Sequence, residues 1–286
     1  MTVRKLGGAT IEKVEEICGP GFKPHRMFPK FNQEAFDAQK GWMLPEHVEA
    51  GSDRLVGSVH TWIVKTPRHT ILIDTCLGND KQRTNPGWRN LDTPFLNRLK
   101  ACGCDPNSVD LVMCTHLHVD HVGWNTMLVD GHWVPTFPKA RYLMGRVEYR
   151  HWTTQRERED MAVVLADSVA PVWAAGLVDL VETDHRICDE ISLVPTPGHT
   201  PGHVSLRIAS MGEEALITGD FMHHPCQIAR PDWSSTADSD PAEARLTRER
   251  MLTGLADTSI LVICTPFAGR TAGHIVPDGG ALRLVV

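Results

Sequence analysis

A short polar segment, Thr115-His-Leu-His-Val-Asp-His-Val-Gly123, gathers the residues most able to do chemistry in this 286-residue chain. His116 and His118 are two positions apart, so on extended backbone their side chains point the same way. Asp120 and His121 follow where the chain must turn, and they face a neighbouring point. Imidazole nitrogens and carboxylate oxygens bind Zn²⁺, and catalytic zinc keeps one position open for water. The segment therefore predicts the start of two metal sites, rather than a surface turn with locally satisfied polar groups.

Two later segments offer further ligands for such a centre. In Pro197-Gly-His-Thr-Pro-Gly-His203 the glycines let the backbone fold tightly around a ligand, and His199 would complete a three-histidine site with the first two imidazoles. His203 is expected to have a supporting or structural role. In Ile217-Thr-Gly-Asp220 a strand delivers one carboxylate, whose two oxygens could bridge two metals.

The elements that must position these ligands are short β-rich runs separated by helical runs. Strands are predicted at residues 58–64, 70–74, 109–114, 191–194, 204–208, 215–218 and 259–264, the first two forming a hairpin. Helices are predicted to begin at Thr93 and Asp240, each as N-cap, while Pro171 must kink or split a helix over 153–176. Several strands run directly into the polar segments, so the ligands should converge at one edge of a sheet sandwich.

Composition is typical of a globular protein and excludes several classes of function. The 29 basic and 35 acidic residues give a net charge of −6, without the basic face typical of nucleic-acid binding. The eight cysteines are scattered, which favours reduced thiols in a cytoplasmic protein, and Cys102-Gly-Cys104 alone is weak support for a metal or redox pair. The first residues lack the apolar core of a signal peptide, and no apolar stretch approaches ~18 residues, so no membrane segment is expected.

The N-terminal segment differs from the rest of the chain. Residues 1–55 mix glycine, proline and aromatic residues, which predicts an irregular arm that serves as a substrate lid or as the contact of a homodimer. Alternatively, its aromatic side chains simply pack on the core. No low-complexity linker divides the remainder, so residues 56–286 are predicted to form one domain of two similar layers of strands and helices.

The HxHxDH segment, the Gly-His-Thr-x-Gly-His turn and the strand-end Gly-Asp together resemble the metallo-β-lactamase-fold hydrolase superfamily, over about residues 55–275. The resemblance implies an α/β fold, the αβ/βα four-layer sandwich of that superfamily. It also implies six metal ligands: His116, His118 and His199 on one metal, Asp120 and His121 on a second, and Asp220 bridging the two. Zinc, one or two ions per chain, is the expected cofactor, although manganese, iron and cobalt accept the same donors.

Further details resemble one branch of that superfamily, which holds acyl-homoserine lactonases, other lactonases and methyl-parathion-type phosphotriesterases. They lie in the segments Asp74–Asp80, Asp120–Asn125 and Gly219–Pro225. In lactonases of this branch, a tyrosine three positions after the bridging aspartate touches the substrate. His223 stands there in this chain, where it could donate a hydrogen bond to a developing oxyanion, act as a general acid, or merely face solvent.

One position departs from the pattern of the branch. The last ligand there is a histidine just after the final core strand, and alignment on Ala272-Gly-His-Ile275 places Pro266 at that position. Because the proline side chain cannot bind a metal, the second metal is expected to bind weakly. His274 could replace the missing ligand, or lie nearer the substrate as a catalytic residue, which is the interpretation favoured here. A metal-binding protein whose catalysis has lapsed is an alternative function.

The expected reaction is hydrolysis of a lactone or neutral ester by a metal-bound hydroxide, because surplus cationic charge lowers the pKa of bound water toward ~7. Asp120 would pass a proton to the leaving alkoxide. No G-x-S-x-G elbow offers a serine nucleophile. Five residues beside the ligand segments are expected to line a mostly apolar wall, unless each belongs to the core: Trp124, Phe221, Met222, His223 and Phe267. Hydrolysis of phosphotriesters or aryl esters is the alternative activity.

Overall fold

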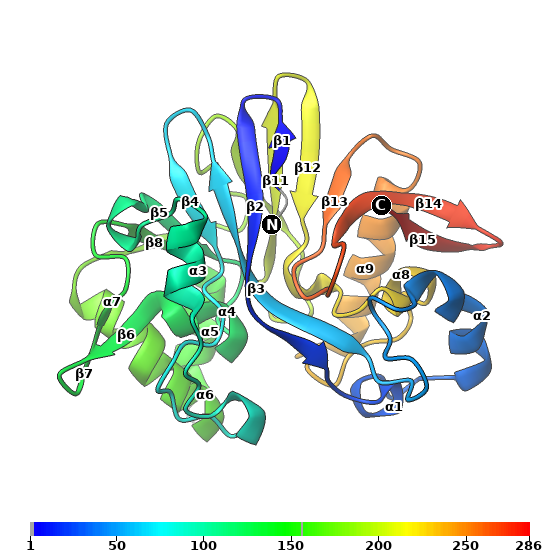
Figure 1. Cartoon of the computed structure of the whole chain (residues 1–286), viewed down its shortest axis with the longest axis horizontal. Coiled ribbons are helices and arrows are strands. Elements are labelled where there is room, and N and C mark those ends of the chain that lie inside the picture. Colours follow the sequence, from blue (N-terminus) through cyan, green and yellow to red (C-terminus); the bar gives the residue numbers. More distant parts are fainter. Residues whose placement is uncertain (1–2, 156) are drawn as a thin grey trace. The chain divides into compact units, whose positions relative to one another are not determined.

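The computed structural model describes residues 3–155 and 157–286, and the chain divides into two compact units (Figure 1). The first unit takes in residues up to 17 and residues 59–185, and the second takes in residues 18–58 and 186–286. Each unit therefore combines part of the N-terminal segment with one half of the remaining chain. Within the described residues, every helix is too short or too polar to cross a lipid bilayer.

The first unit is built on a sheet with the strand order β1-β2-β3-β4-β5-β8-β9. Its strands are β1 (Arg4–Leu6), β2 (Ala9–Pro20), β3 (Val56–Lys65), β4 (Thr70–Ile73), β5 (Leu111–Cys114), β8 (Arg141–Gly145) and β9 (Val178–Val181). A separate hairpin joins β6 (Thr126–Val129) to β7 (His132–Pro135). The predicted β3–β4 hairpin is confirmed, and β4, β5, β8 and β9 are parallel neighbours. Because β4 and β5 are parallel, the residues that follow them lie at one edge of the sheet.

Helices cover this sheet through an apolar core that includes Phe95, Leu99 and Val112, all fully buried. They are η1 (Pro86–Trp88), α3 (Phe95–Ala101), η2 (Pro106–Ser108), α4 (Val119–Val122), η3 (Gly123–Asn125), α5 (Arg146–Thr154), α6 (Glu159–Val164), the π-helix η4 (Leu165–Val169) and α7 (Ala170–Ala174). Pro171 lies in the first turn of α7, so the helix predicted over 153–176 is split, as expected for a residue without a backbone N–H.

The second unit is built on a sheet with the strand order β10-β11-β12-β13-β14-β15. Its strands are β10 (Ile191–Pro195), β11 (Val204–Ser210), β12 (Glu213–Ile217), β13 (Leu261–Ile263), β14 (Ala272–Asp278) and β15 (Ala281–Val285). Its helices are α1 (Pro24–Met27), α2 (Gln33–Met43), η5 (Gly219–Phe221), α8 (Cys226–Ala229) and α9 (Pro241–Leu255). The Asp240 side chain accepts hydrogen bonds from the N–H groups of Ala242 and Glu243, which confirms it as the N-cap of α9.

One prediction about local structure was wrong. Helix α3 has Pro94 rather than Thr93 as its N-cap, because the Thr93 hydroxyl contacts the side chains of Glu16 and Asn79 instead. The strand expected over 259–264 is confirmed over a shorter range as β13, and two strands that were not predicted, β14 and β15, follow it. A Gly-Gly pair at 279–280, both with positive φ, forms the turn between them, and it is a hairpin signal that the sequence did contain.

The N-terminal segment is more regular than predicted, because it contains β1, β2, α1 and α2. Phe28 and Phe36 are fully buried beside Met43 and Trp233, in an apolar cluster of the second unit. These aromatic side chains therefore pack on a core, as the alternative interpretation stated. The lid or dimer-contact role of residues 1–55 and the single domain over 56–286 stay predictions. The cysteine thiols are free, and most of them are buried, as expected.

Candidate metal centre

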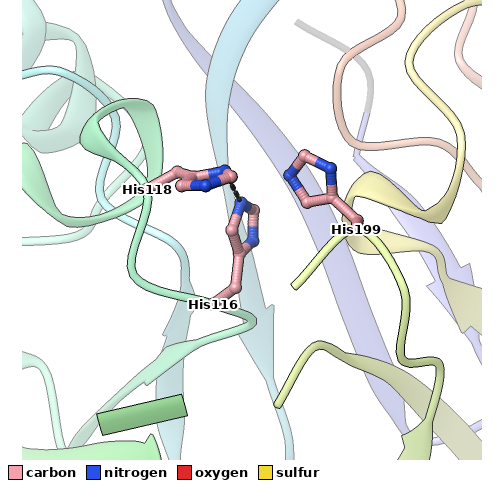
Figure 2. Close-up of side chains that lie close together, drawn as sticks. All are labelled: His116, His118 and His199. Carbon is pink, nitrogen blue, oxygen red and sulfur yellow. Dashed lines mark hydrogen bonds between the residues drawn. The ribbon is translucent and has the colours of Figure 1, made fainter. Parts of the chain in front are cut away.

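The first pair of candidate ligands follows β5. His116 is fully buried, and its Nε2 lies 3.1 Å from Nδ1 of His118, which immediately precedes α4 (Figure 2). Two donors on one ion at about 2.0–2.1 Å are themselves separated by about 3.0–3.4 Å. The two nitrogens therefore have the spacing that a shared metal ion requires, as the alternation of side chains predicted.

The second pair lies on the short helix α4. Nε2 of His121 is 3.8 Å from Oδ2 of Asp120. His121 is buried, whereas a quarter of the Asp120 side chain is exposed. The start of α4 turns the chain away from the extended backbone at His118, and the ring of His121 lies 4.0 Å from that of His116.

Asp74, which directly follows β4, orients both groups of ligands in the first unit. Its carboxylate accepts hydrogen bonds from Nδ1 of His121 (2.8 Å) and from the backbone N–H (2.7 Å) and hydroxyl (2.8 Å) of Thr115. The same hydroxyl lies 3.1 Å from Nδ1 of His116. Both imidazoles are thus engaged through Nδ1, which leaves Nε2 as the donor to a metal. This role was not predicted from the sequence, although a carboxylate at the end of β4 was a usable signal.

A buried carboxylate also supports the loop between the first two histidines. Oε1 of Glu148, on α5, accepts hydrogen bonds from the backbone N–H of Leu117 (3.1 Å) and from Nε1 of Trp152 (2.6 Å). The ring of Trp152 packs 5.3 Å from that of His118. Burial lowers the pKa of His118 to about 4, so its imidazole is neutral at neutral pH, the form that binds metals.

In the second unit, His199 follows β10 and is anchored by a carboxylate in the same manner. Its Nδ1 lies 3.1 Å from Oδ1 of the fully buried Asp238 side chain. Its Nε2 lies 3.9 Å from Oδ2 of Asp220. Oδ2 of Asp238 accepts a hydrogen bond from the backbone N–H of Ser235 (2.8 Å), so this carboxylate is itself held in place. Asp238 was not predicted, because its neighbours in the sequence carry no signal of this role.

Asp220 lies in η5, directly after β12, and its backbone is held by His203. Nε2 of His203 accepts a hydrogen bond from the Asp220 N–H (2.8 Å), and its Nδ1 lies 2.9 Å from the Thr196 hydroxyl. The fully buried His203 is therefore a supporting residue, as predicted. Gly219 adopts a positive φ of 58°, and a Cβ there would lie 2.5 Å from Nε2 of His203, so glycine is required for this close approach.

His223 joins this group rather than facing solvent. Its Nε2 lies 3.8 Å from Oδ2 of Asp220, its ring centroid lies 4.6 Å from that of His199, and only 8% of the residue is exposed. Donor atoms of His199, His223 and Asp238 all lie within 4.8 Å of one another. The neighbouring His224 has a separate role, because its Nε2 bonds the backbone carbonyl of His47 at 2.7 Å.

The structure does not bring His274 to this group. His274 is exposed on β14, where its Nδ1 lies 3.2 Å from the carbonyl oxygen of Ile260. Ile263, at the end of β13, pairs with Ala272, so the antiparallel β14 carries His274 toward the start of β13. Asp220 follows the end of β12, which runs parallel to β13. His274 and Asp220 therefore lie toward opposite ends of these strands, and we leave His274 out of the proposed site.

Pro266 follows β13, as the alignment placed it. Its carbonyl oxygen accepts a hydrogen bond from the N–H of Ser58 (3.1 Å), and its side chain offers no ligand atom. Four residues expected to line a substrate wall are instead buried in apolar cores: Trp124 in the first unit, and Phe221, Met222 and Phe267 in the second. Their large apolar side chains are more stable when packed away from water, so we leave them out of the proposed site as well.

Asp74→Asn is expected to lower zinc affinity by about 10- to 100-fold, the usual effect of losing a carboxylate that orients a metal-bound histidine. The amide keeps the size of the side chain but removes the charge that holds the His121 imidazole. Competition with a fluorescent chelator measures the dissociation constant, and circular dichroism checks the fold. An affinity equal to that of the unmodified protein would contradict the orienting role.

Similarity to a known family extends over most of the chain. A family model described as the metallo-beta-lactamase superfamily matches residues 54–261. The chain belongs to the metallo-β-lactamase superfamily. The predicted α/β fold is confirmed, because solved structures align with this chain over nearly its whole length. The hydrolase AbOPH of the beta-lactamase superfamily has a TM-score of 0.81 at 23% identity, and AidC, a dizinc quorum-quenching lactonase, has 0.79 at 18%. Each alignment covers 99% of this chain and 96% of the other.

Curated proteins similar to this chain match it over shorter stretches. The probable metallo-hydrolase YflN of Bacillus subtilis is 28% identical over 171 residues, which cover 50% of this chain and 62% of that protein. The N-acyl homoserine lactonase AttM of Rhizobium radiobacter is 26% identical over 129 residues, which cover 44% and 46% respectively. The matches thus span less than two thirds of either relative.

Proposed function

We propose that this member of the metallo-β-lactamase superfamily is a metal-dependent hydrolase with a centre for one or two divalent ions. The proposed ligands are His116, His118 and His199 for one divalent ion, Asp120 and His121 for a second, and Asp220 as a bridge. One observation carries the proposal. In each unit a buried carboxylate engages Nδ1 of a histidine, Asp74 for His121 and Asp238 for His199, and so directs Nε2 toward a metal.

Zinc suits these donors, because neutral imidazoles and carboxylates are its usual ligands, and other divalent transition metals accept the same set. The 3.1 Å spacing between the nitrogens of His116 and His118 fits a shared ion, as does the neutral imidazole that burial imposes on His118. When bound, a divalent ion would polarise a carbonyl group and lower the pKa of water to about 7.

The residues of the chain have separable tasks in such a reaction. Asp74 and Asp238 would keep their histidines in the tautomer and orientation needed for binding. His203, by holding the backbone of Asp220, would keep that carboxylate in place. Asp120 is the more exposed carboxylate, so it is the one able to accept a proton from the attacking water and return it to the leaving alkoxide.

A lactone or neutral ester is the substrate class that we propose. It is supported by the relatives named N-acyl homoserine lactonases, which are 26–29% identical over part of the chain. The absence of a G-x-S-x-G nucleophile elbow from the sequence agrees with attack by water rather than by a serine. The net charge of −6 also disfavours a polyanionic substrate such as nucleic acid.

The proposal is tested by measuring metal content together with hydrolysis of an N-acyl homoserine lactone, an aryl ester and a phosphotriester. We expect lactone hydrolysis to disappear on chelation and to return when zinc is added. If the phosphotriester or the aryl ester is hydrolysed faster than the lactone, the faster substrate would define the substrate class instead. Metal binding without any turnover would favour lapsed catalysis, and a protein unable to bind metal would refute the proposal.

A further inference from the structure

We propose that His223 is itself a metal ligand, which adds an imidazole to the ion that His199 and Asp220 would share. The inference rests on the proposed function, because it concerns the same metal centre. It differs from a role as general acid or oxyanion donor, in which His223 would touch the substrate and leave metal affinity unchanged.

The positions of the donor atoms support this assignment. Oδ2 of Asp220 lies 3.8 Å from Nε2 of His223 and 3.9 Å from Nε2 of His199, so one carboxylate oxygen is flanked by two imidazole nitrogens. These separations are too long for hydrogen bonds. Two donors bound to one tetrahedral ion at about 2.0–2.2 Å lie about 3.3–3.6 Å apart, so each pair would have to close by only a few tenths of an ångström to share an ion.

The backbone at His223 is held in place by a buried side chain. Its backbone N–H donates to Oε1 of Gln227 (2.6 Å), and Nε2 of Gln227 donates to the carbonyl oxygen of Trp233 (2.7 Å). Gln227 and Trp233 are fully buried, so this segment is tied into the core of the second unit. A ligand held in this way loses little conformational entropy when it binds a metal.

The other residues of this region are weaker candidates for a further imidazole ligand. The side chain at Pro266 has no donor atom, and His274 is exposed on β14 beside the carbonyl of Ile260. His224 is committed to the backbone carbonyl of His47. Within the part of the second unit that the structure describes, His223 is thus the histidine that approaches Asp220 in addition to His199 and the supporting His203.

The test compares His223→Gln with His274→Gln, a matched change at an exposed histidine. Zinc affinity is measured by chelator competition, zinc per chain by elemental mass spectrometry after dialysis, and the coordination sphere by the visible spectrum of the Co²⁺-substituted protein. We expect His223→Gln to weaken zinc binding at least about 10-fold and to change the Co²⁺ absorption bands. His274→Gln should match the unmodified protein in all three measurements.

Unchanged zinc affinity and an unchanged Co²⁺ spectrum in His223→Gln would overturn the assignment, even if hydrolysis were slower, and would instead favour contact with substrate. A less stable variant remains informative, because the rise in unfolding temperature on adding zinc is compared within each variant and reports its own affinity. If the unmodified protein binds zinc and hydrolyses lactones, and His223→Gln binds zinc equally well, only this inference is refuted. An unmodified protein that binds no metal refutes the proposed function as well.

Discussion

His116→Ala is expected to reduce lactone hydrolysis by more than about 100-fold and to lower the zinc content per chain. His116 is fully buried, its Nδ1 is held by the Thr115 hydroxyl, and its Nε2 is 3.1 Å from Nδ1 of His118. Alanine removes one of the few strong contacts to the proposed ion. The loss should therefore exceed the 10- to 100-fold effect typical of residues that only orient a ligand. Steady-state kinetics and elemental mass spectrometry measure the two effects.

The matched control is His132→Ala, which makes the same change at an exposed histidine of β7 and should leave zinc content and hydrolysis unchanged. Circular dichroism of the metal-free proteins separates loss of the ligand from loss of the fold. Full zinc content and full activity in His116→Ala would show that the polar segment after β5 is not part of a metal centre.

Asp167→Ala is expected to lower the free energy of unfolding by about 3–5 kcal/mol, because it leaves buried cations without their partner. The Asp167 carboxylate accepts two hydrogen bonds from the Arg83 guanidinium, at 2.6 and 2.9 Å, and lies 3.5 Å from Nζ of Lys81. Both cationic side chains are almost completely buried. Nζ of Lys81 also donates to the Thr126 hydroxyl (2.8 Å) and lies 3.7 Å from the centre of the Trp133 ring.

The loss in free energy of unfolding caused by Asp167→Ala should become smaller as the pH rises from 7 to 9. Burial lowers the pKa of Lys81 to about 8 despite the attraction of Asp167, so the folded protein releases this proton at a lower pH than the unfolded chain. Stability therefore gains from this group as the pH rises above about 8. Removing Asp167 lowers the Lys81 pKa further, so in the variant the gain starts at a lower pH.

Urea unfolding followed by tryptophan fluorescence at both pH values measures these differences. Glu182→Ala is the control, because the Glu182–Arg146 pair is exposed, and its loss should cost less than about 1 kcal/mol. A similarly small effect of Asp167→Ala would show that the buried cations are stable without it.

Most of the proposed ligands and several helices and strands could be predicted from the sequence, because short stretches of residues carry the signals for them. The spacing of His116 and His118 follows from the alternation of side chains on extended backbone, and the contact between their nitrogens agrees with it. Asp240 caps α9, and Pro171 lies in the first turn of α7, because hydrogen-bonding capacity and the absence of an N–H are properties of single residues.

The partners that orient and support those ligands were decided by the tertiary structure. Asp74 reaches His121 from 47 positions away, and Asp238 reaches His199 from 39 positions away. Such contacts depend on which strands are neighbours and where their ends meet, and no periodicity in the sequence encodes this. The same reason explains why His274 does not join this group. Its position in the sequence made it a plausible ligand, but the register of β13 and β14 places it away from Asp220.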